Sequence, residues 1–260
     1  MKKYLMIVQT TLKEYAAYRL NFLLWRVRTL LNLLIIIFIW EASFNQNNPD
    51  PNLIFKKDYF LSYFIYAITI SYLILGTTTT DIAFQINSGG IINLLLKPVS
   101  FFKYYFFKDL TDKAINLFFA IIEAILVIYF LKINLIFPKN LFLGSVFLVN
   151  GVFISFFINL LLSFIGFWSR EVWAPRFLFI IIVSFVSGSF FPLDILPKII
   201  YQFLLLTPFP YLYYLPTKIF LGGEINLMFT ISSFFWVFAF YYLTKKIFIK
   251  GLKNFSYWGR

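Results

Sequence analysis

The stretch AINLFFAIIEAILVIYFL, residues 114–131, decides the fold class, because it is a long apolar run placed between two lysines. A membrane-spanning α-helix needs roughly 20 predominantly apolar residues, with a range of about 17–25. Lys113 and Lys132 flank the run, and Glu123 is the charged residue inside it. The sequence therefore predicts a helix that crosses a lipid bilayer here.

The composition of the whole chain agrees with a membrane protein. Its 260 residues are 61% hydrophobic, 23% aromatic and only 13% charged, with a mean hydropathy of +0.81. Soluble domains are about 45–50% apolar and about 25% charged. A soluble core could not absorb 37 phenylalanines, so we expect one transmembrane domain over residues 1–260. The N-terminus is not typical of a signal peptide, because polar residues interrupt its apolar run.

The chain contains neither cysteine nor histidine. We therefore expect no disulfide, no thiolate or histidine chemistry, and no zinc or haem held by the usual ligands. A membrane enzyme acting on lipid would need carboxylates with a metal ion, and the sequence shows no such cluster. We expect no catalytic residue, metal site or cofactor on this chain.

Hydropathy predicts five further spans on either side of the first one. They cover residues 27–44, 59–75, 141–167, 177–191 and 227–243. The run at 141–167 is long enough to span with tilt, whereas the run at 177–191 is short for a spanning helix. The fold class predicted is an all-α polytopic membrane protein with six transmembrane helices.

Basic residues are distributed unevenly between the predicted loops. With the N-terminus inside, 17 of the 23 Lys and Arg residues lie on the cytoplasmic side. Cytoplasmic loops carry an excess of these residues, so the net charge of +12 requires no nucleic-acid partner. We expect both termini and Gly89 in the cytoplasm, and Asn47 and Gly223 outside.

Residues 1–25 precede the first span and have an amphipathic pattern. One helical face carries Leu5, Val8, Leu12, Tyr15 and Ala16, and the other carries Lys2, Lys3, Gln9, Thr10 and Lys13. This pattern favours a helix that lies in the cytoplasmic interface of the lipid bilayer. A soluble helix is the alternative, but so hydrophobic a chain is expected to offer it no packing partner.

The stretch DIAFQINSGGIINLLLKPV, residues 81–99, interrupts the apolar spans. We expect Asp81 to cap a short helix that packs through Ile82 and Ile86. Gly89 and Gly90 predict a turn, since glycine accepts positive φ.

A second short helix is expected over residues 91–96, and Pro98 ends it. Its packing side carries Ile91, Leu94 and Leu95. Because both helices are too short to cross a bilayer, segment 81–97 is expected at the cytoplasmic membrane surface with its glycine tip exposed.

The segment 188–223 is apolar but repeatedly broken. The residues that break a helix here are Gly188, Pro192, Pro197, Pro208, Pro210 and Pro216. Irregular apolar backbone at membrane depth must pack on protein or line a cavity. We expect short re-entrant helices on the outer face, started by Pro192 and Pro197. Three tyrosines are expected at headgroup level: Tyr211, Tyr213 and Tyr214.

The order of these elements resembles the membrane subunit of a type-2 ATP-binding-cassette exporter. The motifs that carry the resemblance are INSGGIINLLLKPVS (86–100), SGSFFPLDILP (187–197), TPFPYLYYLPTKIFLGG (207–223) and GLKNFSYWGR (251–260). The resemblance covers nearly the whole chain. It implies a permease in a prokaryotic plasma membrane that moves an amphipathic or lipid-like substrate outward.

The resemblance also implies partners. Segment 86–96 would be a coupling helix that docks on an ATPase subunit, through Ile86, Asn87, Ser88, Gly89, Gly90, Ile91, Leu94 and Leu95. The chain has no G-x-x-x-x-G-K-[ST] loop, so ATP and Mg²⁺ are expected on that partner. A second permease, identical or paralogous, would complete the transporter. The NSGG tip lacks the charge expected for docking, which leaves the contact residues open.

Polar residues within the spans are the remaining candidates. Glu123 is either a functional carboxylate or a protonated one hydrogen-bonded to a neighbouring helix. Three asparagines fit interhelical hydrogen bonds better than substrate ligands: Asn116, Asn150 and Asn159. Asp109 and Asp112 fit the start of a helix better than a metal pair.

The second cytoplasmic loop combines charged residues with tryptophans, namely Trp168, Arg170, Glu171, Trp173 and Arg176. It is expected to anchor at the membrane interface, with a secondary ATPase contact as the alternative. An ion-coupled transporter is disfavoured because it would need more intramembrane acids and an internal repeat. A non-transporting assembly subunit stays open.

Overall fold

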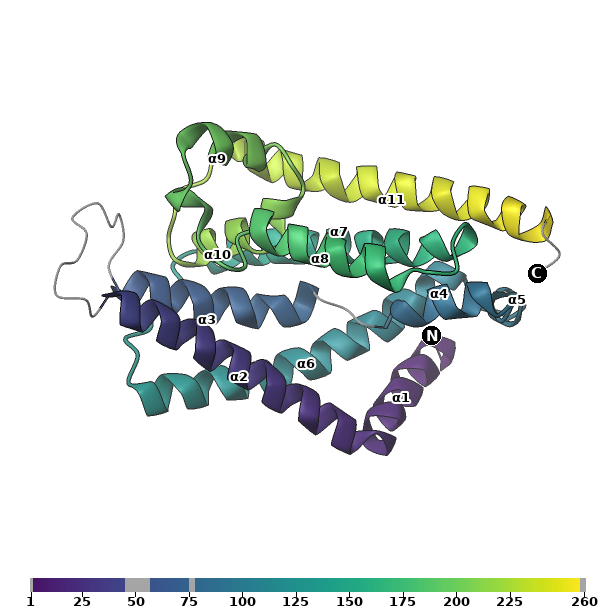
Figure 1. The fold of residues 1–260 in the computed structure, drawn as a ribbon, viewed down its shortest axis with the longest axis horizontal. Coiled ribbons are helices and arrows are strands. Elements are labelled where there is room, and N and C mark those ends of the chain that lie inside the picture. Colours follow the sequence, from purple (N-terminus) through teal and green to yellow (C-terminus); the bar gives the residue numbers. More distant parts are fainter. Residues whose placement is uncertain (1, 45–56, 75–77, 258–260) are drawn as a thin grey trace.

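The computed structural model describes residues 2–44, 57–74 and 78–257, and every regular element within these ranges is a helix. The long helices run along the long axis of the molecule (Figure 1). They are α2 (Arg19–Phe44), α3 (Lys57–Ile74), α6 (Phe101–Leu131), α7 (Leu141–Phe164), α8 (Trp173–Val186) and α11 (Leu227–Tyr257). The expected outer position Asn47 and the predicted end of the second span at Leu75 lie outside the described residues.

The short helices gather at the two ends of this bundle (Figure 1). One end, which we call the hairpin end, holds α4 (Thr80–Asn87), α5 (Ile91–Leu95) and η1 (Ile165–Phe167). The opposite end, which we call the folded-back end, holds η2 (Leu193–Ile195), α9 (Lys198–Leu205), η3 (Phe209–Tyr211) and α10 (Tyr214–Phe220). The start of α1 (Lys2–Ala17) and the end of α11 both lie toward the hairpin end.

Four helical segments of the described chain are long and apolar enough to cross a membrane. They are Arg19–Ala42, Phe101–Leu131, Leu141–Phe167 and Leu227–Phe255. Helix α8 is apolar but has only 14 residues, and α3 has 18. The six-span prediction is thus supported for four helices and stays a prediction for α3 and α8.

Helices α6 and α11 extend well beyond the apolar runs that predicted them. Helix α6 begins at Phe101 rather than at residue 114, and α11 ends at Tyr257 rather than at residue 243. The extra turns carry lysines, which lower the local hydropathy, but aromatic packing holds them together. Phe101 stacks on Phe248 with ring centroids 4.7 Å apart.

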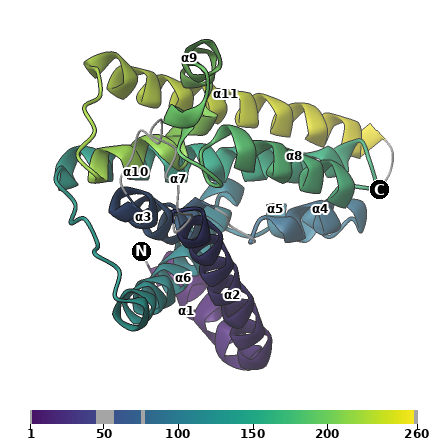
Figure 2. The same cartoon turned by 60° about the vertical axis from the view of Figure 1, so that its left-hand side comes forward.

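Helix α7 is the centre of the bundle. It packs against α3, α4, α10 and α11, and Figure 2 shows it between α11 and α3. At Gly151 the backbone of η3 comes so close that a Cβ would lie 2.8 Å from the carbonyl oxygen of Tyr211. This close approach explains why a glycine occupies the middle of a buried helix.

The tyrosines of the folded-back end lie in the core of the bundle. Tyr211, Tyr213 and Tyr214 are buried in the largest apolar cluster, which joins the folded-back end to α3 and α7. They are buried because the chain folds back onto α3 and α7 after α9, and their expected position at headgroup level stays a prediction. The expected helix starts hold, since Pro192 and Pro197 are the N-cap residues of η2 and α9.

The N-terminal segment 1–25 is not one helix. Helix α1 ends at Ala17, and α2 begins at Arg19 at an angle to it (Figure 1). Contrary to expectation, α1 has a packing partner, because Ile7 and Thr11 are buried and Tyr4 stacks on Phe107 of α6. Leu5 and Leu12 stay exposed, so the interfacial position of this helix remains a prediction.

Candidate functional site

The hairpin formed by α4 and α5 buries one side and exposes the other. Ile82, Ile86 and Ile91 are buried in an apolar cluster with side chains from α6, α7 and α11. Phe84 lies on the opposite side of α4, and 69% of its surface is exposed. The predicted packing side of α5 is wrong for Leu95, which is 41% exposed, because the five-residue helix seats mainly through Ile91.

The turn between the two helices depends on one glycine. Gly89 has φ +79°, in the left-handed region, which favours glycine. Gly90 has φ −63°, so the prediction of positive φ at both glycines is wrong for Gly90. A Cβ on Gly90 would meet the end of the Gln85 side chain, which can move. Ser88 is exposed at the tip.

The start of α4 differs from the expected cap. Thr79 is the N-cap residue, and Asp81 lies in the first turn without capping the helix. The Asp81 carboxylate is 3.5 Å from Nζ of Lys108, which is also 3.4 Å from the Glu14 carboxylate. Asp81 therefore links α4 to α6, and through Lys108 to α1, in a position where its charge favours the helix dipole.

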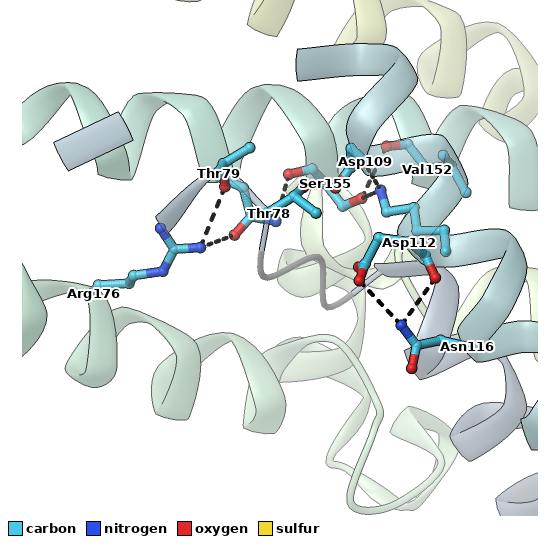
Figure 3. A network of polar contacts seen from close by, with 10 residues as sticks. Thr78, Thr79, Asp109, Asp112, Asn116, Val152, Ser155 and Arg176 are labelled. Atoms are coloured by element: carbon cyan, nitrogen blue, oxygen red, sulfur yellow. Dashed lines mark hydrogen bonds and ion pairs between the residues drawn. The ribbon is translucent and has the colours of Figure 1, made fainter. Parts of the chain in front are cut away.

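Polar bonds hold the base of the hairpin to α7 and α8. Ser163 donates to the carbonyl oxygen of Thr79 at 2.7 Å. The Arg176 guanidinium donates to Asn159 Oδ1 at 2.9 Å and to Ser163 Oγ at 3.2 Å. It also donates to Thr79 Oγ1 at 3.5 Å (Figure 3). Arg176 is thus a buried link and not a free basic residue of the cytoplasmic loop, as its place in the sequence suggested.

A buried ion pair joins the same base to α6. Lys113 Nζ lies 2.7 Å from the Asp109 carboxylate and donates to Ser155 Oγ of α7 at 3.3 Å. Thr78 donates to Asp109 at 3.1 Å (Figure 3). Because α6 begins at Phe101, Asp109 and Asp112 lie within the helix and not at its start, which corrects the dipole interpretation. The described residues contain no group of three or more side chains suited to a metal ion.

Helix α1 joins α6 through a second polar cluster. The Tyr15 hydroxyl donates to Asp112, and Asn116 donates to the Asp112 carbonyl at 2.9 Å and to its carboxylate at 3.3 Å. Burial, with the negative charge of Asp112 as the next cause, raises the pKa of Tyr15 above its ordinary value. Tyr15 therefore stays a neutral donor, and Asn116 supports this contact.

Glu123 forms an ion pair that neither sequence interpretation anticipated. Arg26 of α2 donates through Nε at 2.7 Å to one carboxylate oxygen, and its Nη2 lies 2.6 Å from the other. The guanidinium also lies 4.5 Å from the ring centroid of Tyr72 on α3. Arg26, one of the basic residues counted on the cytoplasmic side, is buried and ties α2 to α6.

The other two asparagines link helices of the bundle. Asn150 donates to Ser233 Oγ of α11 at 2.8 Å, and Asn159 accepts from Arg176. Neither lines the large groove described next.

A groove of about 1080 Å³ opens between α2 and the helices beside it. Its walls come from α1, α2, α3, α6 and α8, and apolar side chains such as Leu31 alternate with polar ones. The polar side chains lining it include Asn21, Arg28, Asn32, Ser71, Asn116 and Ser184. A groove with both kinds of lining suits a molecule that has apolar and polar parts.

A smaller pocket of about 550 Å³ lies at the tip of the hairpin. It is lined by Phe84, Asn87, Ser88 and Gly89 of the hairpin and by Arg170 of the loop between α7 and α8. Asn87 donates to the carbonyl oxygen of Arg170 at 3.1 Å. The helical spacing of α4 is enough to predict that Phe84 lies opposite Ile82 and Ile86. No local sequence pattern predicts that Arg170 lies next to the hairpin, because Asn87 and Arg170 are 83 residues apart in the chain.

The folded-back end has a polar cluster of its own. Lys218 lies 2.7 Å from Asp194, and the Tyr214 hydroxyl donates to the same carboxylate at 2.6 Å. Although burial acts to lower the pKa of Lys218, the hydrogen bond and charge of Asp194 raise it overall. This pair stabilises a local fold, since its members lie close together in the chain.

Comparison with known families gives one match. The model of a family described as ABC-2 family transporter protein matches residues 30–259, which is most of the chain. Among curated proteins, none matches this chain.

Proposed function

The chain belongs to the ABC-2 family of transporter proteins, and we propose that it is a permease subunit of an ATP-binding-cassette exporter. Its apolar helices make it a multi-pass membrane protein, and its family implies association with an ATPase subunit. In this proposal the hairpin end faces the cytoplasm, both termini are cytoplasmic and the folded-back end faces outward. The excess of Lys and Arg at the hairpin end supports this orientation.

The observation that carries the proposal is the α4–α5 hairpin. It is too short to cross a membrane, one side is seated on the bundle, and Ser88 at its tip is exposed. Its base bonds to α6 through Asp109, to α7 through Ser163 and to α8 through Arg176. A push on the tip therefore acts on three long helices at once.

The proposed mechanism assigns the chemistry to the partner. ATP binding and hydrolysis by the ATPase subunits move the hairpin, and the long helices change between two packed arrangements. The chain itself has no phosphate-binding loop motif. Its role is mechanical, and ATP with Mg²⁺ is held by the partner.

The lining of the groove beside α2 is the basis for proposing a second permease subunit and an amphipathic substrate. Polar side chains such as Asn32 and Arg28 line it within an apolar surrounding, which is costly if lipid tails alone cover them. A second copy or a paralogue facing this groove would enclose a path with both polar and apolar walls. We propose outward movement of an amphipathic or lipid-like molecule along that path.

The decisive experiment reconstitutes the chain in vesicles with and without its cognate ATPase. We expect ATP-dependent transport of a fluorescent phospholipid only with the ATPase present. Transport driven by an ion gradient alone would instead indicate a secondary transporter, and ATPase binding without transport of any tested cargo would favour an assembly subunit.

Orientation and coupling are tested with variants of this naturally cysteine-free chain. A cysteine at position 89 should react with an impermeant thiol reagent only in inside-out vesicles, and a cysteine at position 223 only from outside. The variant Gly89→Val/Gly90→Val should insert normally but lose ATPase binding or coupled transport, because valine resists the φ of Gly89. Full binding and transport would show that the hairpin is an ordinary loop.

A further inference from the structure

The tip of the hairpin has no charge of its own, but the fold places one beside it. Residues 86–90 carry no ionisable side chain. Arg170 reaches the tip from the loop between α7 and α8, and the two segments line one pocket of about 550 Å³. The charge that the NSGG sequence lacks is therefore supplied by a different loop.

Arg170 is available to a partner. It is exposed, and no residue of the described chain forms a hydrogen bond or ion pair with its guanidinium. The neighbouring carboxylate of Glu171 is already used, because it accepts from the amides of Trp173 at 3.0 Å and Ala174 at 3.2 Å at the start of α8. The positive charge at the tip is thus uncompensated.

The hairpin and the Arg170 loop are joined by contacts before, at and after Arg170. Asn87 donates to the carbonyl oxygen of Arg170 at 3.1 Å. Before the loop, Gly166 packs so closely that a Cβ would lie 3.2 Å from the carbonyl oxygen of Ala83. After the loop, Arg176 bonds to Thr79. Arg170 is held between two points that are both fixed to α4.

The pocket combines an exposed aromatic ring with an arginine. Phe84 is 69% exposed although it lines the same pocket as Arg170. An exposed aromatic residue next to an arginine is typical of the energetically important part of a protein interface. The guanidinium can bind a carboxylate through two parallel hydrogen bonds.

We propose that Arg170 and Phe84, together with the Gly89 tip, form a composite docking surface for an acidic segment of the ATPase subunit. This inference rests on the proposed function and names the chemistry of the partner at that site. A carboxylate of the ATPase pairs with Arg170, and an apolar side chain next to it covers Phe84. Anionic lipid is a poorer occupant, because lipid headgroup sites readable from sequence use clusters of basic residues.

The test measures the affinity of the cognate ATPase for the full chain in nanodiscs of neutral phosphatidylcholine. Arg170→Glu should weaken binding about tenfold or more, because it places like charges opposite each other. Lys13→Glu, an equal charge change at an exposed site on α1 outside the pocket, is the matched control and should change affinity less than about twofold. Phe84→Ala should also weaken binding, and this loss should persist at high salt while that of Arg170→Glu shrinks.

A crosslink identifies the partner segment. Cysteine replacing Arg170, the sole cysteine in the chain, should crosslink to an ATPase peptide that contains Asp or Glu. Changing that carboxylate to lysine should restore the affinity of the Arg170→Glu chain. A crosslink to a segment without acidic residues would overturn the proposal.

The outcomes separate this inference from the proposed function. If the wild-type chain binds the ATPase and Arg170→Glu binds equally well, the composite surface is wrong and the permease function stands. If the wild-type chain does not bind the ATPase, both the composite surface and the proposed permease function are wrong. If Arg170→Glu changes behaviour only when phosphatidylglycerol is added to the nanodiscs, Arg170 contacts lipid and the inference is overturned.

Discussion

Both ends of the molecule are built from short helices, but they pack in different ways. At the folded-back end, Tyr211 and Tyr214 are buried in the main apolar cluster, and the Lys218–Asp194 pair is bonded to tyrosine. At the hairpin end, one side of α4 is buried while Phe84 and Ser88 of the turn stay exposed. The folded-back end is part of the core, whereas the hairpin end presents a surface that a partner can cover.

The difference also lies in how each end is attached. Close apolar packing fixes the folded-back end, and such packing resists displacement. The hairpin end combines its apolar contacts with directional bonds at its base, since Thr78 donates to Asp109 of α6 and Thr79 accepts from Ser163 of α7 and Arg176 of α8. We infer that a displacement of the hairpin is passed to these helices through the bonds at its base, whereas the folded-back end offers a partner no comparable exposed side chain.

Breaking the buried ion pair beneath the hairpin should have the largest effect. Lys113 and Asp109 are only 1% and 3% exposed, and Lys113→Met would leave the carboxylate buried without its cation. We expect a loss of about 3–5 kcal/mol in the free energy of unfolding, measured in mixed micelles. Lys103→Met, on an exposed face of the same helix, is the control. Equal stability of the two variants would show that the pair does not hold the hairpin end.

The same substitution at one glycine of each end tests the comparison directly. Gly188 and Gly89 both have positive φ, at 84° and 79°. A Cβ at Gly188 would lie 2.8 Å from both Tyr214 Cβ and the Tyr63 hydroxyl. Gly188→Ala should therefore lower the free energy of unfolding by about 2–4 kcal/mol. Gly89→Ala should lower it by only about 1 kcal/mol, because the added methyl group causes backbone strain but no clash. Similar unfolding free energies for both variants would contradict the contrast between the ends.

Glu123 tests the middle of the bundle, between the two ends. Glu123→Gln keeps the shape but removes the charge that pairs with Arg26, so we expect a loss of about 1.5–3 kcal/mol in unfolding free energy. Because the two side chains touch, Arg26→Gln/Glu123→Gln should be less destabilised than the sum of the single variants. If the destabilisation of the double variant equals the sum for the two single variants, Arg26 and Glu123 do not stabilise the protein through their interaction.

Much of the fold was predictable from sequence because apolar runs in a membrane protein are long and clear. The central span at 114–131, the run at 141–167 and the broken segment after Gly188 all correspond to observed helices or breaks. The start of α6 was missed because Lys103, Lys108 and Lys113 lower its hydropathy. Hydropathy identifies segments that can contact lipid, but it does not show that a helix continues beyond the apolar segment.

The candidate site was predictable only in part. The hairpin and its glycine turn follow from local pattern, and Ile82 and Ile86 are buried as expected. The partners of Glu123 and Asn159 were not predictable, because Arg26 and Arg176 resemble ordinary positive charges flanking a span. The sequence identifies the polar residues within the helices, but their partners are seen only once the helices are packed together.

The pairing of Arg26 with Glu123 has a consequence for how the protein enters the membrane during synthesis. Arg26 lies in the N-terminal part of α2, just before the apolar run at 27–44, and its partner carboxylate lies 97 residues later in the chain. At about 5–20 residues per second, the ribosome needs roughly 5–20 s to reach it. During this interval Arg26 has no carboxylate partner, so α2 can take its final place against α6 only after Glu123 has been synthesised.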